Sequence, residues 1–265
     1  MFVSGATSSM LVWREEFCRE LADQGRHVIR FDNRDTGQSS NFPLGRPGYT
    51  LQDLADDVVG LIDALGLGSA HLAGMSMGGM IAQLATLAHS DRVRTLTLMM
   101  TSPDPSAVSM LSDEPSASAL PGPWPAVVAG MADRMMLDRA DPEATLDAVI
   151  TMNRILAGTR HPYDETADRA LRGSEIERAR CYANTANHSR VVGAAPSWRH
   201  RLGEITTPTL VIHGTEDPIL PYPHGVALAS EILGAKLVTL EGVGHEIPRS
   251  VLFEMIPSIV EHTAG

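Results

Sequence analysis

A serine flanked by two glycines separates a strand-like run from a helical run in residues 69–80. Ala70 to Ala73 is apolar enough for a short buried strand, Gly74-Met75-Ser76-Met77-Gly78 follows, and residues 81–88 have a helical pattern. A chain that passes from strand to helix this quickly must turn sharply, and a Cβ at either glycine would clash. The sequence therefore predicts a tight turn that lifts the Ser76 hydroxyl above a sheet and points the Met77 N–H at the same space.

A serine hydroxyl is a weak nucleophile, so it needs a base and an acid that orients the base. Two later strand-like runs, 209–212 and 236–240, are each followed by a turn, and these turns contain Asp217 and His245. Parallel sheets carry their functional residues just past the carboxyl ends of the strands. We therefore predict that Asp217 is the acid and His245 the base.

With serine, aspartate and histidine in this order, the chain resembles the α/β-hydrolase family from residue 1 to its last predicted helix. The stretch 27–39, which includes Arg34-Asp35-Thr36-Gly37, narrows the resemblance. It is similar to the subgroup of aclacinomycin methylesterase and the related macrolide esterases, which are serine esterases of large polyketide antibiotics. The resemblance implies an α/β-hydrolase fold, with a mostly parallel sheet flanked by helices and an inserted helical cap.

The resemblance also implies further roles near the predicted nucleophile. Ser4-Gly5 aligns with a His-Gly turn of the family, which places the second oxyanion-binding N–H at Ala6, beside that of Met77. Two competitors for the acid and base stay open. Asp104 follows an earlier strand but lies between two prolines, where a turn role is expected, and family geometry puts the base on a later loop than that of His213.

The start of the chain departs from the family pattern. Family members have two strands before the strand that residues 1–4 resemble, so the first two strands are expected to be missing here. The predicted strand 27–31 would then lie at a sheet edge. Since an unpaired edge pairs readily with other chains, we expect either aggregation or a homodimer through this edge. The alternative is that the natural chain starts upstream of Met1 and has the two further strands.

Residues 102–202 interrupt the alternation of strands and helices and predict a helical cap between two core segments, 1–101 and 203–265. Helical patterns occur near 126–138, 142–157 and 174–188. The chain has 13 methionines but only 5% aromatic residues, which favours a soft, roomy apolar cavity. The residues expected to line this cavity are Met75, Trp124, Met131, Met135 and Met136. Ordinary helix packing is the competing interpretation of each of them.

The bulk properties exclude several classes of protein. The formal net charge of −11 argues against nucleic acid or an anionic membrane as a partner. No apolar run is long enough to cross a bilayer, and no secretory signal is recognisable at Met1. The two cysteines, Cys18 and Cys181, are expected to be reduced thiols, which favours the cytoplasm.

Ser76, Asp217 and His245 predict a serine carboxylic ester hydrolase that works through an acyl-enzyme on a small-molecule ester. Such an enzyme needs no metal or organic cofactor. A carboxylate nucleophile, as in haloalkane dehalogenases and epoxide hydrolases, does not fit Ser76. The subgroup resemblance implies a bulky polyketide ester as the substrate and slightly favours opening of a macrolide antibiotic lactone. The alternatives are a methyl esterase of an anthracycline-type polyketide, a general small-ester hydrolase, and a non-catalytic ligand-binding member of the family.

Overall fold

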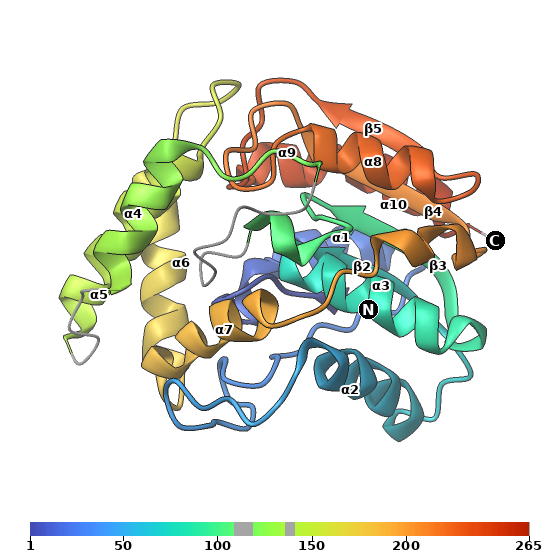
Figure 1. Cartoon of the computed structure of the whole chain (residues 1–265), viewed down its shortest axis with the longest axis horizontal. Coiled ribbons are helices and arrows are strands. Elements are labelled where there is room, and N and C mark those ends of the chain that lie inside the picture. The colour runs from blue at the N-terminus through green and yellow to red at the C-terminus, as the bar shows by residue number, and fades with distance from the viewer. Residues whose placement is uncertain (109–118, 136–140, 265) are drawn as a thin grey trace.

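The computed structural model describes residues 1–108, 119–135 and 141–264 (Figure 1). Within these residues, five strands form one parallel sheet in the order β1-β2-β3-β4-β5. The strands are β1 Phe2–Val3, β2 Ala70–Met75, β3 Val93–Met99, β4 Thr209–Gly214 and β5 Lys236–Leu240. The predicted α/β-hydrolase fold class is confirmed. No helix in the described part of the chain is long and apolar enough to cross a membrane.

Alternate residues of each strand enter two different hydrophobic cores. Leu72 and Val211 pack into the core under α2 and α3, whereas Ala73 and Ile212 pack into the core under α1, α9 and α10. This alternation follows from the two-residue period of a strand, and nearly continuous apolar strands are expected of a parallel sheet with helices on both faces. The helices that flank the sheet are α1 Glu15–Asp23, α2 Leu51–Ala64, α3 Met77–Ala88, α8 Pro223–Glu231, α9 Arg249–Glu254 and α10 Ile256–His262.

The predicted strand 27–31 is reduced to a single bridge, so this prediction is wrong in its extent. Arg30 forms an isolated parallel bridge with Phe2, and the Phe2 N–H donates to the Ile29 carbonyl over 2.8 Å. The reason is the length of the neighbour: β1 contains two residues and offers too few backbone groups for a longer ladder.

In the described part of the segment between β3 and β4, four α-helices, here called the cap helices, stand over the carboxyl ends of the strands: α4 Pro125–Met135, α5 Pro142–Leu156, α6 Glu165–Arg178 and α7 Asn187–Gly193. In Figure 1, α4, α5 and α6 form a layer of their own at the left of the sheet. The helix predicted near 174–188 is wrong in its bounds. α6 begins earlier, at Glu165, where the Asp164 carboxylate caps the helix by accepting the Ala167 N–H. The helix ends at Arg178.

Candidate active site

The turn around Ser76 is as sharp as the glycine pattern predicts. Ser76 has φ 54° and ψ −124°, a strained conformation for a residue with a side chain. A Cβ on Gly74 would lie 2.2 Å from the Gly78 carbonyl oxygen, and one on Gly78 would lie 2.1 Å from that of Val3. The two glycines thus let strand, turn and helix pack directly against one another, and this contact fixes the position of Ser76.

Asp217 and His245 meet across the carboxyl ends of β4 and β5. The His245 Nδ1 and an Asp217 carboxylate oxygen are 2.7 Å apart. The other oxygen of the fully buried Asp217 accepts the N–H groups of Ile219 and Leu220, both at 2.9 Å. Since those bonds fix the carboxylate, it can hold the imidazole with Nδ1–H towards itself and leave Nε2 as an acceptor.

The two competing residues have other hydrogen-bond partners, although the His213 Nε2 lies 3.7 Å from the Asp217 oxygen that faces His245. His213 is fully buried; its Nε2–H donates to the Leu220 carbonyl over 2.7 Å, and burial lowers its pKa. Asp104 accepts the N–H and hydroxyl of Ser106 at 3.0 and 2.7 Å, an arrangement typical of a turn. Neither side chain lines the cavity that contains Ser76 and His245.

Two backbone N–H groups lie beside Ser76. A Cβ on Gly5 would be 3.2 Å from the Ser76 Cβ, so the turn after β1 packs against the serine. Within the described residues, the N–H groups of Ala6 and Met77 have no hydrogen-bond partner, and the Ser76 hydroxyl has none either. Unpaired donors at a turn and at a helix N-terminus suit a developing negative charge on oxygen.

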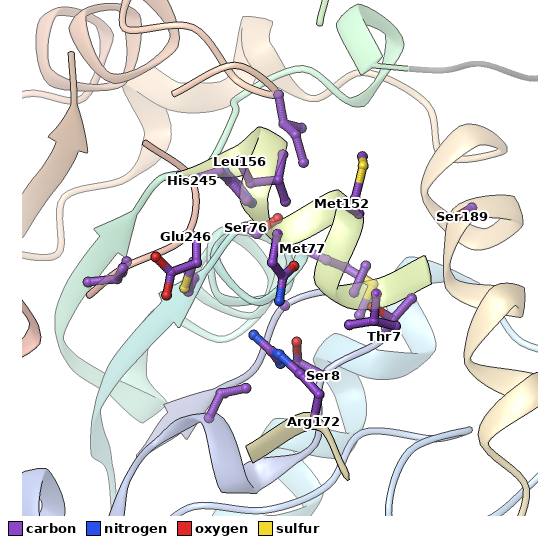
Figure 2. Close-up of a pocket in the computed structure, with 18 of the residues that line it drawn as sticks. Thr7, Ser8, Ser76, Met77, Met152, Leu156, Arg172, Ser189, His245 and Glu246 are labelled. Atoms are coloured by element: carbon purple, nitrogen blue, oxygen red, sulfur yellow. The ribbon is translucent and has the colours of Figure 1, made fainter. Parts of the chain in front are cut away.

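A cavity of about 500 Å³ opens over Ser76 (Figure 2). Figure 2 shows Ser76 and His245 on its wall, with Met152 and Leu156 of α5 above Ser76 in this view. Among the residues that the structure describes, five methionines line the cavity: Met75, Met77, Met80, Met131 and Met152.

The cavity contains some of the residues expected to bind substrate and not others. Met75 and Met131 are in its wall, whereas Trp124 is 48% exposed and outside the lining residues. The side chain of Met135 and the whole of Met136 lie outside the part of the chain that the structure describes.

One wall of this cavity is charged, which the sequence did not predict. Arg172 of α6 donates to Asp168 and Glu175 at 3.1 and 2.6 Å, and Figure 2 shows it facing the cavity below Ser76. Glu246 follows His245; burial and the nearby Asp168 carboxylate raise its pKa to about 7. The spacing 168, 172, 175 is a helical signal, but the expected helix began too late to include Asp168 and Arg172.

No group of three or more His, Cys, Asp or Glu side chains within residues 1–108, 119–135 and 141–264 is arranged to hold a metal ion. The site brings together a strained serine, a histidine held by a buried carboxylate, and two N–H groups that lack a partner among the described residues, all beside a cavity.

Comparisons with known proteins identify the family of the chain. The chain is 33% identical to a rhodomycin D methylesterase of Streptomyces sp. strain C5 over 99% of its own length and 90% of that protein. It is 31% identical to a rhodomycin D methylesterase of Streptomyces peucetius, with the same coverage of both chains. An esterase structure from Exiguobacterium antarcticum superposes with a TM-score of 0.76 at 22% identity, covering 100% of this chain and 91% of that one. The sequence model of the alpha/beta hydrolase fold matches residues 1–248, and the chain belongs to the α/β-hydrolase family.

Proposed function

We propose that this protein hydrolyses the methyl ester of a polycyclic, anthracycline-type polyketide through an acyl-enzyme on Ser76. The observation that carries the proposal is the cavity of about 500 Å³ with Ser76 and the Asp217-bound His245 on its wall. Pockets of about 300–1,000 Å³ hold drug-sized ligands, so a fused-ring ester fits this space.

In the proposed mechanism, the Ser76 hydroxyl attacks the ester carbonyl while His245 takes its proton. Asp217 keeps the imidazole oriented and stabilises its charged form. The N–H groups of Ala6 and Met77 bind the oxyanion. Methanol leaves with the proton from His245, and an acyl-enzyme remains. His245 then deprotonates a water that attacks the acyl group, and the acid and the free serine are released.

The two full-length relatives confirm the predicted class, a carboxylic ester hydrolase, because both are named methylesterases. They do not support the macrolide lactone that the sequence analysis favoured; they support its alternative, the anthracycline methyl ester. The predominantly apolar cavity walls suit flat, fused rings, since Met75, Met131 and Met152 adapt their shape to large apolar ligands.

A panel of three substrates tests this proposal: an anthracycline methyl ester, a macrolide lactone and a short chromogenic ester. We expect release of methanol and the demethylated acid from the first, measured by mass spectrometry. A macrolide that gains one water, with an unchanged anthracycline, would move the substrate to lactones. Turnover of the short ester alone would indicate a general small-ester hydrolase, and no turnover of any ester would indicate a ligand-binding member.

Substitutions in the proposed catalytic residues test the mechanism itself. Ser76→Ala should lower kcat by roughly 10⁴-fold or more, because only binding and the oxyanion donors remain. Asp217→Asn should cost a similar factor, since the amide favours the wrong tautomer of His245. The matched control is Asp104→Asn, a buried aspartate in a turn after β3, which should keep kcat within about threefold. A larger loss in the control than in Asp217→Asn would move the acid to Asp104.

A further inference from the structure

Side chains of the cap helices hold the turn that follows β1. The Thr7 N–H donates to His188 Nδ1 of α7 over 3.1 Å. The N–H and hydroxyl of Ser9 donate to one Glu175 oxygen of α6 over 2.6 and 2.8 Å. Residues about 170 positions later in the chain therefore supply the partners that this turn cannot find in the sheet.

The His188 ring is fixed by both of its nitrogens. A backbone N–H can only donate and a carbonyl can only accept, so Nδ1 accepts from Thr7 while Nε2–H donates to the Arg34 carbonyl over 2.7 Å. The side chain has 0% exposure, and burial lowers its pKa. At neutral pH the ring is thus an uncharged bridge between the turn and the loop at Arg34.

Thr7, whose N–H binds His188, has a strained backbone. Thr7 has φ 64°, a left-handed conformation that is a genuine outlier for a β-branched residue. Its neighbour Ala6 lines the cavity together with Ser76, and the Ala6 N–H has no partner among the described residues. The Ala6–Thr7 peptide plane, whose N–H binds His188, meets the plane that contains the Ala6 N–H at the Ala6 Cα. Release of Thr7 from its strained conformation would therefore free the Ala6 N–H to turn away from the serine.

We infer that His188 is a positioning residue for the oxyanion site: by binding the Thr7 N–H, it holds the strained turn in the shape that aims the Ala6 N–H at the ester oxygen. The inference rests on the proposed function, because it assigns a task within that reaction. It makes the cap part of the machinery that stabilises the transition state as well as part of the substrate cavity.

A buried histidine with two hydrogen bonds is also a common structural feature, and the chain contains a matched example. His224 is fully buried, with Nδ1 2.8 Å from the Ser102 hydroxyl and Nε2 2.9 Å from the Pro121 carbonyl. It has no bond to the turn after β1 and does not line the cavity. His224 therefore controls for the general cost of removing a buried, bonded imidazole.

The first experiment measures kcat and KM for a short chromogenic ester in His188→Asn, His188→Leu and His224→Leu, with unfolding midpoints for all three. Removing an oxyanion donor costs about 10²–10³ in kcat, and misplacing one costs part of that. We expect His188→Leu to lose about ten- to hundredfold in kcat with KM within about twofold. Asparagine places an acceptor near the position of Nδ1, so His188→Asn should stay within about threefold of wild type.

The control decides between positioning and general stability. His224→Leu should lower the unfolding midpoint while leaving kcat within about threefold. Equal losses of kcat in His188→Leu and His224→Leu, or a normal kcat in His188→Leu, would overturn the inference. If His188→Leu does not fold, His188→Ala replaces it. If neither folds, a loss beyond about threefold in His188→Asn overturns the inference, and a retained kcat supports it.

A second-site variant tests the strain directly. Glycine adopts a left-handed φ readily, so in Thr7→Gly the turn should depend less on the hydrogen bond to His188. We expect His188→Leu to cost at least threefold less in kcat when measured against the Thr7→Gly protein than against wild type, a coupling that a double-mutant cycle detects. Additive losses would contradict the inference. Turnover that survives Ser76→Ala would instead overturn the proposed function, which keeps the two failures distinct.

Discussion

Glu246 carries a carboxyl group whose environment conflicts with its charge. Burial and the neighbouring Asp168 carboxylate together raise its pKa from 4.5 to about 7, although Arg172 and Arg14 oppose the shift. The folded chain therefore binds a proton on Glu246 between about pH 4.5 and pH 7 that the unfolded chain has released. Since the folded state binds more protons in this window, stability from this group falls as the pH rises through it and is lost above about pH 7.

Glu246→Gln should remove this pH dependence, because an amide cannot ionise. Above pH 8 the variant should unfold at a higher temperature than wild type, with a gain of up to about 3 kcal/mol, whereas near pH 4.5 the two should be similar. Thermal unfolding at a series of pH values measures this difference. Glu241→Gln, an exposed glutamate in the same loop region, is the control. Parallel curves for wild type and Glu246→Gln would contradict the prediction.

At the scale of single residues, the sequence predicted those site residues whose positions follow from local backbone patterns. Gly74, Ser76 and Gly78 define a turn by themselves, and the structure gives Ser76 the strained conformation expected there. His188 and Glu246 could not be found in this way. His188 meets its partner Thr7 across 181 positions of sequence, and the burial of Glu246 depends on α5 and α6, so their chemistry exists only after the chain has folded.

At the scale of elements, predictions succeeded where capping and apolar periodicity agreed. The helix predicted at 142–157 is α5, whose N-cap Asp141 accepts two backbone N–H groups in front of Pro142. α6 was misplaced because its buried positions are the charged Asp168 and Glu175 rather than an apolar stripe. In sequence, a helix face with buried charged residues looks the same as a face exposed to solvent. The position of α6 beside the cavity, which the sequence does not show, explains why these charged residues are buried.

The apolar lining contributed by α4 leads to a prediction about specificity. Met131 lines the cavity and packs against the cluster of Val127, Met152 and Leu156. Met131→Ala should raise KM for a bulky polyketide ester by about tenfold and leave that for a short ester nearly unchanged, because only the bulky ester fills the lost contact. Steady-state kinetics on both esters measure this.

Val128→Ala offers a matched control on the same helix. Val128 is 41% exposed and does not line the cavity, so its loss should change neither KM. If Met131→Ala changed the two esters equally, α4 would contribute to folding rather than to substrate choice.

At the scale of the whole molecule, the cap is bound to the core on both sides of the cavity. On one side, the Leu156 carbonyl at the end of α5 accepts the N–H groups of His245 and Glu246, at 2.9 and 3.2 Å. The Arg160 N–H also donates to the Gly242 carbonyl over 2.8 Å. On the other side, α6 and α7 hold the turn after β1. The loop of the proposed base and the proposed oxyanion turn are thus both attached to the cap.

This double attachment predicts that cap and core unfold as one cooperative unit. Far-ultraviolet circular dichroism, which reports all helices, and tryptophan fluorescence, to which the cap residue Trp124 contributes, should give the same midpoint. Two separated transitions would show that the attachments do not couple the two parts.

Two glycine substitutions test the contact between cap and core directly. A Cβ on Gly158 would lie 2.2 Å from the Gly242 carbonyl oxygen, in the contact between cap and core, whereas one on Gly173 in α6 would reach nothing closer than 4.0 Å. Gly158→Ala should therefore lower the single midpoint by several degrees and also lower kcat, because the strained contact moves the loop of His245. Gly173→Ala should raise the midpoint slightly, since alanine favours the helix, and leave kcat unchanged. A Gly158→Ala protein that lost stability but kept full kcat would show that this contact holds the cap without positioning the base.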